Sequence, residues 1–156
     1  MTPPVREARP DDLPAVQKDV QEAYSPYVAR IGREPGPLLD DYARRIAAGE
    51  VEVVDGPDGL AAILVLVPEK GALLLDNVAV ANAARGRGLG AALIDHAEAR
   101  ARALGLPVVR LYTHELMTEN HAIYAKRGYV ETHRAEENGL RRVFMAKAVQ
   151  LGEDGS

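Results

Sequence analysis

The stretch Arg85-Gly86-Arg87-Gly88-Leu89-Gly90 lies between a hydrophobic strand candidate and a helix candidate, and it decides how the chain is interpreted. Three glycines in five residues leave several backbone N–H groups unobstructed by side chains. The unpaired donors of a first helical turn and the positive end of the helix dipole favour phosphate, and Arg85 and Arg87 add positive charge. We therefore expect an anion-binding turn, with a merely flexible connection as the alternative.

The segments on either side of this turn have the patterns of a strand and a helix. Residues 72–80 form the most hydrophobic strand candidate, interrupted only by Asp76-Asn77, which is typical of a central strand. From Leu89 the apolar residues recur at helical spacing until Gly105, which favours the end of a helix, and a strand follows over 108–112. A strand, a crossover helix and a strand predict parallel pairing.

The remaining elements are predicted from the same signals of periodicity and turn residues. Further strands are expected at 5–8, 51–54, 60–67, 129–132 and 140–147. Further helices are expected up to about Tyr24, over 38–48 and over 118–127, with a loop between the first two. The turn-rich residues 55–59 predict an antiparallel hairpin.

Composition limits the class of protein. The chain has 156 residues, of which 47% are hydrophobic and 27% charged, as in one ordinary globular domain. No apolar run approaches the roughly 18 residues of a membrane span, and the start of the chain lacks a secretory pattern, so we expect a cytoplasmic protein without a membrane partner. The absence of cysteine excludes disulfides and thiol nucleophiles, and a net charge of -4 argues against nucleic-acid binding.

The sequence also bears on three other kinds of site. Gly86-x-Gly88-x-x-Ala91 fits the dinucleotide fingerprint of an NAD-binding enzyme, with Glu115 downstream, but five residues separate Val80 from the first glycine and too little chain remains for a second nucleotide-binding half. No Gly-Lys-Ser or Gly-Lys-Thr occurs, which excludes an ATPase phosphate loop. His114-Glu115 begins like a zinc-protease helix but lacks the second histidine, so we expect no metal.

Three motifs together resemble the GNAT superfamily of N-acetyltransferases. They are Val78-Ala79-Val80, the turn at 85–90 and Tyr124-Ala125-Lys126-Arg127-Gly128-Tyr129. The resemblance is strongest over residues 73–131. It implies an α/β fold in a single domain over residues 1–150, with a frayed tail at 151–156. The central mixed sheet would be mostly antiparallel, with six or seven strands, one splayed parallel pair and about four flanking helices.

The resemblance also implies a cofactor, acetyl-CoA, and assigns residues to it. Val78, Ala79 and Val80 would pair with the pantetheine arm of CoA, and Arg85, Gly86, Arg87, Gly88, Leu89, Gly90 and Ala91 would hold its pyrophosphate. Tyr124 would protonate the departing thiolate, which suits a phenol held close to sulfur.

Two positions depart from the pattern of many relatives. Met117 stands where an asparagine is common, so Asn120 is the candidate CoA contact, with helix capping as the alternative. Leu74 stands where some relatives carry a glutamate base. In a regular strand the side chains of Asp76 and Leu74 point to the same face of the sheet. Asp76 is therefore our candidate general base, acting directly or through water, and a capping or bulge role is the alternative.

The same resemblance assigns the acceptor pocket in part to the first two helices and their connection. Tyr24, Tyr27 and Arg30 on the segment 24–33 offer an aromatic wall and a carboxylate anchor, with solvated arginines as the alternative, and Asn77 is a further substrate-binding candidate. We therefore predict an enzyme that acetylates a primary amine of a small molecule, an amino acid or a peptide-like substrate. A CoA-binding sensor without catalysis and an NAD-binding enzyme are the alternatives, and a homodimer is left open.

Overall fold

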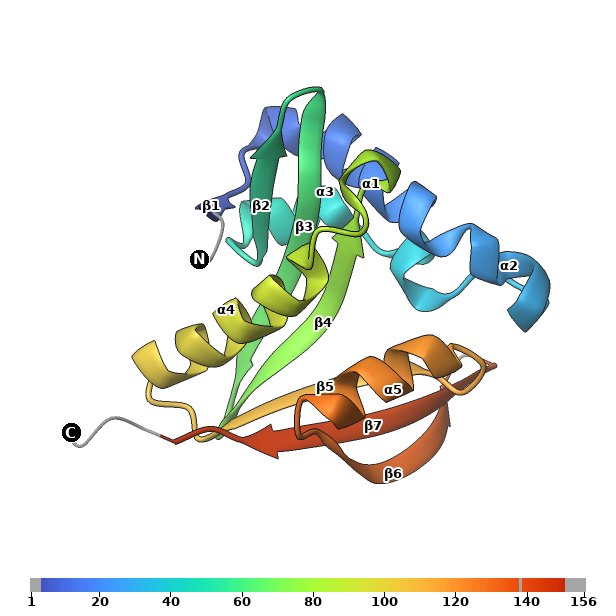
Figure 1. The fold of residues 1–156 in the computed structure, drawn as a ribbon, viewed down its shortest axis with the longest axis vertical. Helices are drawn as coiled ribbons and strands as arrows, with labels where there is room; N and C mark the ends of the chain where they lie inside the picture. Colours follow the sequence, from blue (N-terminus) through green and yellow to red (C-terminus); the bar gives the residue numbers. More distant parts are fainter. Residues whose placement is uncertain (1–3, 138, 151–156) are drawn as a thin grey trace. The chain divides into compact units, whose positions relative to one another are not determined.

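The computed structural model describes residues 4–137 and 139–150, which form a mixed sheet covered by helices (Figure 1). The seven strands pair in the order β1-β2-β3-β4-β5-β7-β6. They are β1 (Arg6–Glu7), β2 (Val51–Gly56), β3 (Gly59–Glu69), β4 (Ala72–Val80), β5 (Val108–His114), β6 (Val130–Glu137) and β7 (Leu140–Ala148). The α-helices are α1 (Leu13–Tyr24), α2 (Pro26–Ile31), α3 (Tyr42–Ala47), α4 (Leu89–Ala103) and α5 (Thr118–Lys126). The predicted α/β class and mixed sheet are confirmed. The tail predicted to fray at 151–156 lies outside the described residues.

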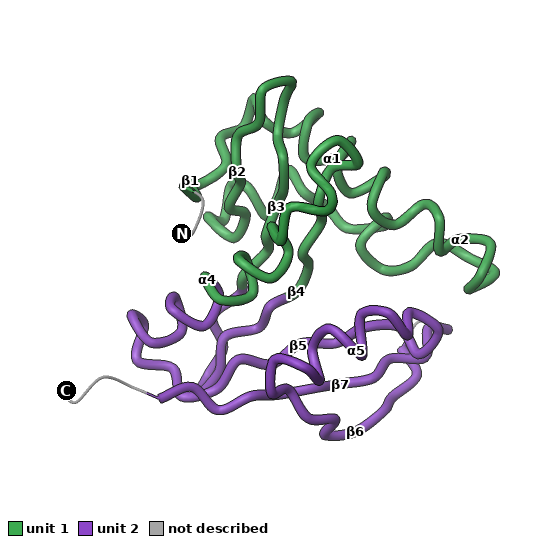
Figure 2. The backbone as a smooth tube through the Cα atoms, in the orientation of Figure 1, with its two compact units in different colours: residues 1–66, 76–96 green, residues 67–75, 97–156 purple. Residues whose placement is uncertain are grey.

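The chain divides into two compact units, which Figure 2 colours separately. Unit 1 consists of Met1–Leu66 and Asp76–His96, and unit 2 consists of Val67–Leu75 and Ala97–Ser156. Strands β3 and β4 and helix α4 each contribute residues to both units. The expectation of a single domain over residues 1–150 stays a prediction.

In unit 1 the hairpin of β2 and β3 is antiparallel, as predicted. Its register runs from Val51 opposite Val65 to Gly56 opposite Gly59, with an irregularity after Val54. Helices α1 and α3 lie behind these strands in Figure 1, and the start of α4 lies in front of them. Alternate strand residues can therefore be buried on both faces, which explains the continuous apolar run in β3.

The helices of unit 1 differ from the sequence prediction in two places. The expected loop after Tyr24 contains helix α2, because Pro26 occupies its first turn, where an amide is not needed and the fixed φ suits a helix. The helix expected over 38–48 is shorter, because Asp40 is extended and Asp41 caps α3 by accepting from the Arg44 amide. A 3-10 turn, η2 (Gly36–Leu39), takes up the preceding residues.

Unit 2 contains the parallel pair that the crossover pattern predicted. Strand β4 pairs with β5 in parallel from Leu73 opposite Val109 to Leu75 opposite Leu111. Strands β5, β7 and β6 pair in antiparallel fashion. Strand β6 continues to Glu137, beyond the expected end at 132, because its register with β7 resumes after a shift between Glu131 and His133. Within the described residues, no helix combines the length and apolar character that crossing a bilayer requires.

Candidate active site

The glycine-rich turn connects β4 to α4 through the 3-10 turn η3 (Asn82–Ala84). Gly86 and Gly88 have left-handed φ values of 81° and 71°, and a Cβ built on either glycine would meet no heavy atom within 4 Å. The Gly88 carbonyl accepts the first helical hydrogen bond from Ala92, at 3.1 Å. The amides that open α4 therefore have no partner inside the helix and lie beside open space, as an anion site requires.

Helix α1 holds the residues that lead into this turn through hydrogen bonds. The Glu22 carboxylate accepts the Asn82 amide at 2.9 Å, and the Glu22 carbonyl accepts from the Arg85 guanidinium at 3.4 Å. Arg87 is exposed on the turn itself. Helix α1 therefore braces the segment before the turn, and Arg87 supplies positive charge at the turn.

The end of β4 keeps polar backbone groups that its parallel neighbour does not use. The register of β4 with β5 covers Leu73 to Leu75 and stops before Val78. Val78 and Val80 are half-buried, whereas Ala79 is buried, so the strand alternates as it leaves the paired region. These are the three residues predicted to face the pantetheine arm of CoA.

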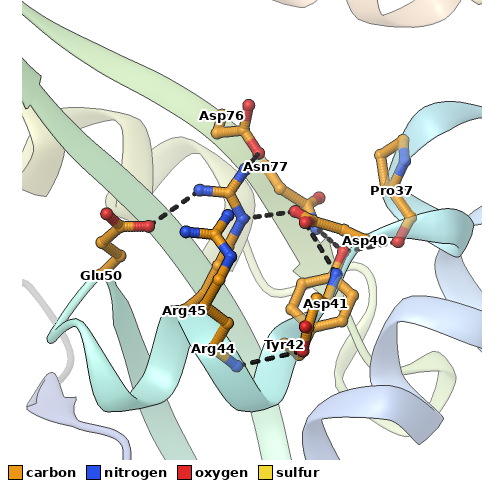
Figure 3. Close-up of polar contacts among 9 residues, drawn as sticks. All are labelled: Pro37, Asp40, Asp41, Tyr42, Arg44, Arg45, Glu50, Asp76 and Asn77. Carbon is orange, nitrogen blue, oxygen red and sulfur yellow. Dashed lines mark hydrogen bonds and ion pairs between the residues drawn. The ribbon is translucent and has the colours of Figure 1, made fainter.

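Behind β4, Asn77 is held by two tyrosines. The Tyr24 hydroxyl lies 2.5 Å from Asn77 Oδ1 and 3.1 Å from the Val78 carbonyl oxygen, and Asn77 Nδ2 donates to the Tyr42 hydroxyl at 2.9 Å. Tyr42 donates in turn to the Pro37 carbonyl at 2.6 Å (Figure 3). Burial raises the pKa of Tyr42, with Asp40 and Asp76 adding to the rise, so its hydroxyl stays protonated. The amide is thus satisfied at both ends.

Asp76, the candidate base, contacts Arg45 of α3. Arg45 Nη2 lies 3.3 Å from Asp76 Oδ2, and the same guanidinium pairs with Asp40 and with Glu50 (Figure 3). The Asp76 side chain is 7% exposed. Its carboxylate therefore has a fixed counter-ion, as a structural ion pair would, and its role as a general base stays a prediction.

In unit 2, Tyr124 lies on α5, as the sequence predicted. The residue is half-buried, and burial raises the pKa of its phenol to about 12. Its ring meets that of Tyr129 edge to face, with centroids 5.8 Å apart. Among residues 4–137 and 139–150 the Tyr124 hydroxyl has no hydrogen-bond partner, so a protonated phenol is left available.

Tyr129 differs because its hydroxyl is already bonded. It donates to Glu98 Oε2 at 3.1 Å, and Lys147 Nζ donates to Glu98 Oε1 at 3.0 Å. Burial, followed by the charge of Glu98, raises the pKa of Tyr129. Sequence reasoning missed Glu98 and Lys147. A carboxylate on the buried face of α4, next to Ala97 and one turn after Ile94, was the signal that could have found Glu98.

The other predicted site residues fall into separate places. Tyr27 and Arg30 lie together on α2, with the guanidinium 5.0 Å from the ring centroid. Asn120 lies in the first turn of α5, but the N-cap residue is Met117 and no side chain caps this helix. The capping alternative for Asn120 is therefore wrong. In the described part of the chain, no group of three or more potential ligands could hold a metal ion.

The fold and the turn define a class of protein: a mixed sheet with one short parallel pair, whose first parallel strand leads through a glycine-rich turn into the start of a helix. The NAD alternative needs a mostly parallel, doubly wound sheet, which this chain does not have. Residues 45–131, more than half of the chain, match the family model of the Acetyltransferase (GNAT) domain. The chain belongs to the GNAT acetyltransferase family.

Solved structures share the fold at low sequence identity. The PaiA N-acetyltransferase of Thermoplasma acidophilum, in complex with coenzyme A, has a TM-score of 0.75 and 16% identity over 95% of this chain and 99% of that one. The ribosomal-protein-S18-alanine N-acetyltransferase of Escherichia coli has a TM-score of 0.73 and 19% identity over 98% of each chain. Ard1 of Thermoplasma volcanium has a TM-score of 0.74 and 20% identity over 96% and 99%. No curated protein matches the chain.

Family membership makes acetyl-CoA the cofactor, and the residues of the turn fit it. Gly86 and Gly88 leave open space where a side chain would otherwise stand, the first amides of α4 are unpaired within the helix, and Arg87 is exposed beside them. These features match the two negative charges of a pyrophosphate. Acetyl transfer is therefore the chemistry that this fold carries.

Proposed function

We propose that the chain is an N-acetyltransferase that acetylates a primary amine directly, without a covalent enzyme intermediate. The observation that carries the proposal is the pair of left-handed glycines, Gly86 and Gly88, which face open space just before α4, in the turn that connects it to β4. Bound acetyl-CoA supplies an activated acetyl group as a thioester. The amine nitrogen bonds to its carbonyl carbon, the C–S bond breaks, and the sulfur leaves as CoA thiol.

The chain's own residues have three tasks in this reaction. Gly86, Gly88 and Arg87 hold the pyrophosphate, and the backbone of Val78 to Val80, which lies beyond the register of β4 with β5, orients the pantetheine arm and so places the acetyl group for attack. Asn120 is a further candidate for contact with CoA. This positioning is the largest part of the proposed catalysis, because a neutral amine is already a good nucleophile.

Proton transfer is assigned to two side chains. Tyr124 donates its phenolic proton to the departing thiolate. Its hydroxyl has no hydrogen-bond partner among the described residues, and its pKa of about 12 keeps it protonated at neutral pH. Asp76 takes the proton that the attacking ammonium must lose, directly or through water.

The role of Asp76 is tested with two variants. Because Arg45 holds the Asp76 carboxylate, the matched variants are Asp76→Asn and Arg45→Met. If the rate of Asp76→Asn falls further below that of the wild type as the pH is lowered, Asp76 acts as a general base. If both variants lose the same fraction of the rate at every pH, the ion pair has a structural role only.

The acceptor is assigned to unit 1, to residues of α1, α2 and β4. Tyr24 and Asn77 form one hydrogen-bonded pair there, and Tyr27 and Arg30 form a second, cationic and aromatic pair. The Arg30 guanidinium suits a carboxylate near the amine. We therefore propose an amino acid, a peptide-like amine or a related small molecule as acceptor.

The test of the proposal uses the glycines of unit 1 as matched variants. Gly88→Ala and Gly32→Ala each place a Cβ at a left-handed position in open space, so both pay a similar backbone strain, but only Gly88 lies in the turn. We expect Gly88→Ala to weaken CoA binding by at least about tenfold in calorimetry, and Gly32→Ala to bind as the wild type does.

The same protein is then supplied with acetyl-CoA and a panel of primary amines, and free CoA thiol is measured. Release that depends on an amine, together with an N-acetylated product in mass spectrometry, supports the enzyme. CoA binding without release for any amine favours the sensor. Stabilisation by NAD and not by CoA in thermal unfolding would overturn the cofactor assignment.

A further inference from the structure

Unit 1 contains a cavity of about 730 Å³ at the end of its strands. It is lined by residues of α1, of the tip of the β2–β3 hairpin and of the segment from Ala81 to Ala92. Its volume lies in the range of small-molecule sites, which is roughly 300 to 1,000 Å³. None of the residues proposed above to receive the acceptor, Tyr24, Tyr27, Arg30 or Asn77, lines it.

The wall of this cavity contains one buried carboxylate, Asp19 of α1. Asp19 is 3% exposed and lies on the same helix face as the buried Val16 and Val20. Among the described residues its Oδ2 atom has no hydrogen-bond partner. A buried carboxylate oxygen without a partner destabilises the folded state, so a purely structural residue at this position would be apolar.

The charged side chains around Asp19 do not neutralise it. The other charged residues that line the cavity are Lys18, Glu22, Asp55, Asp58 and Arg87. Lys18 is directed to Glu22, at 3.7 Å, and Asp55 is paired with Arg6, at 2.8 Å. Asp58 and Arg87 are exposed. Burial, followed by the charge of Glu22, raises the pKa of Asp19 to about 7, and Lys18 opposes the rise only in part.

Much of the remaining lining is aliphatic. Val54 and Leu60 of the hairpin, Ala61 of β3 and Ala81 after β4 contribute aliphatic surface. An apolar wall with a single deep anion suits a ligand that has an aliphatic or aromatic body and a cationic end. Such a cation supplies both the charge and the hydrogen-bond donors that Asp19 lacks.

We propose that this cavity binds a small organic ammonium ion, whose N–H groups donate to Asp19 and whose apolar body packs against Val54 and Leu60. The site is separate from the residues assigned to the acceptor amine and goes beyond the proposed acetyl transfer. It adjoins the cofactor turn, because Arg87, Gly88 and Leu89 also line the cavity.

The test is an NMR titration of the full chain with 2-phenylethylamine and with its neutral counterpart 2-phenylethanol. We expect the amine to shift the amides of residues 54–61 and 81–92, and the alcohol to bind at least roughly tenfold more weakly. Asp19→Asn removes the charge and should weaken binding of the amine by a similar factor. Asp11→Asn removes an exposed carboxylate outside the cavity and should leave the affinity unchanged.

Affinity should also depend on pH in a defined direction. The amine stays cationic throughout, whereas Asp19 ionises as the pH rises through about 7, so binding should strengthen between about pH 6 and about pH 8. Asp19→Asn should abolish this dependence. Equal binding of alcohol and amine, unchanged affinity in Asp19→Asn, or shifts confined to residues outside the cavity would each overturn the proposal.

Two further measurements keep the test independent of folding and of the cofactor. Ala15→Phe fills the cavity from α1 while leaving Asp19 in place, so it should also abolish binding even if Asp19→Asn does not fold. In the presence of saturating CoA, the affinity for the amine should stay within about threefold of its value without CoA. Displacement of the amine by CoA would mean that the cavity belongs to the cofactor site, and would overturn the proposal of a separate site for the ammonium ion. Failure of acetyl transfer, by contrast, leaves these binding results untouched.

Discussion

Each compact unit contains a buried polar cluster with tyrosines, and the two clusters use their hydroxyl groups differently. In unit 1, both Tyr24 and Tyr42 are bonded to Asn77, and their hydroxyls also reach backbone carbonyls. In unit 2, Tyr129 is bonded to Glu98, but the neighbouring Tyr124 contacts it only through the ring edge. A phenol whose hydroxyl is already paired supports the structure, whereas one left unpaired in the described chain can serve chemistry.

The first prediction tests this difference directly and has the largest expected effect. Tyr124→Phe should lower kcat by about a thousandfold, since general acid catalysis contributes roughly 10² to 10⁴. Its free energy of unfolding should barely change, because no hydrogen bond within the described chain is lost. Steady-state thiol release and urea unfolding measure the two quantities.

Tyr129→Phe is the matched control for Tyr124→Phe. It removes the bond to Glu98, so it should lower the free energy of unfolding by about 1 to 2 kcal/mol and reduce kcat far less than the Tyr124 variant. If Tyr124→Phe lost stability and kept its rate, the roles given to the two tyrosines would have to be exchanged.

The second prediction breaks the cluster of unit 1. Asn77→Leu keeps the number and branching of side-chain heavy atoms but removes the bonds to Tyr24 and Tyr42, and should lower the free energy of unfolding by about 3 kcal/mol. Asn120→Leu is the control, since the Asn120 side chain has no hydrogen bond to any described residue. Urea unfolding of both variants checks the difference, and an equal loss would contradict the structural role of Asn77.

The third prediction concerns the ion pair of unit 2. Lys147→Met leaves the buried Glu98 with no cation closer than Arg102, at 4.0 Å, among the described residues, and should lower the free energy of unfolding by about 2 kcal/mol. The double variant Lys147→Met with Glu98→Gln should recover most of that loss, because a neutral amide still accepts from Tyr129. Thermal and urea unfolding measure the recovery, and no recovery would argue that packing of the Lys147 stem is what matters.

The fourth prediction is a small effect with a defined sign. A phenol is the proton donor below its pKa, and burial raises the pKa of Tyr124 to about 12. Deprotonation of Tyr124 should therefore not reduce kcat between about pH 8 and about pH 10, where an ordinary tyrosine begins to ionise. A pH–rate profile of the wild type, with Tyr124→Phe as reference, checks this. A fall centred near pH 9 that is absent in the variant would contradict it.

Much of the fold could be predicted because its signals are local. Glycine and proline mark the ends of elements through their own φ preferences, so the hairpin, the strand before the turn, helix α4 and helix α5 fall where the sequence indicated. Helix α2 was missed because Ser25-Pro26 was interpreted as an end, although proline equally opens a helix. The length of β6 was missed because it depends on pairing with β7 rather than on its own polar residues.

The sites divide along the same line. Gly86, Gly88 and Arg87 were found from the sequence, since a left-handed φ and a helix start are properties of a few consecutive residues. Arg45 and Glu98 were not found, because their partners Asp76 and Tyr129 lie 31 residues away in each case. The unpaired Asp19 was missed for the same reason, since its spacing alone places it only on one face of α1.

The sequence by itself determined the anion-binding turn, because the chemistry of that turn lies within one segment of the chain. Only the tertiary structure decided which tyrosine hydroxyls are already bonded, because Tyr24 and Tyr42 meet Asn77 across 53 and 35 residues. It also decided that a carboxylate at Asp19 would be buried beside a cavity. Hydrogen-bond satisfaction and desolvation depend on neighbours in space, and no local pattern specifies those.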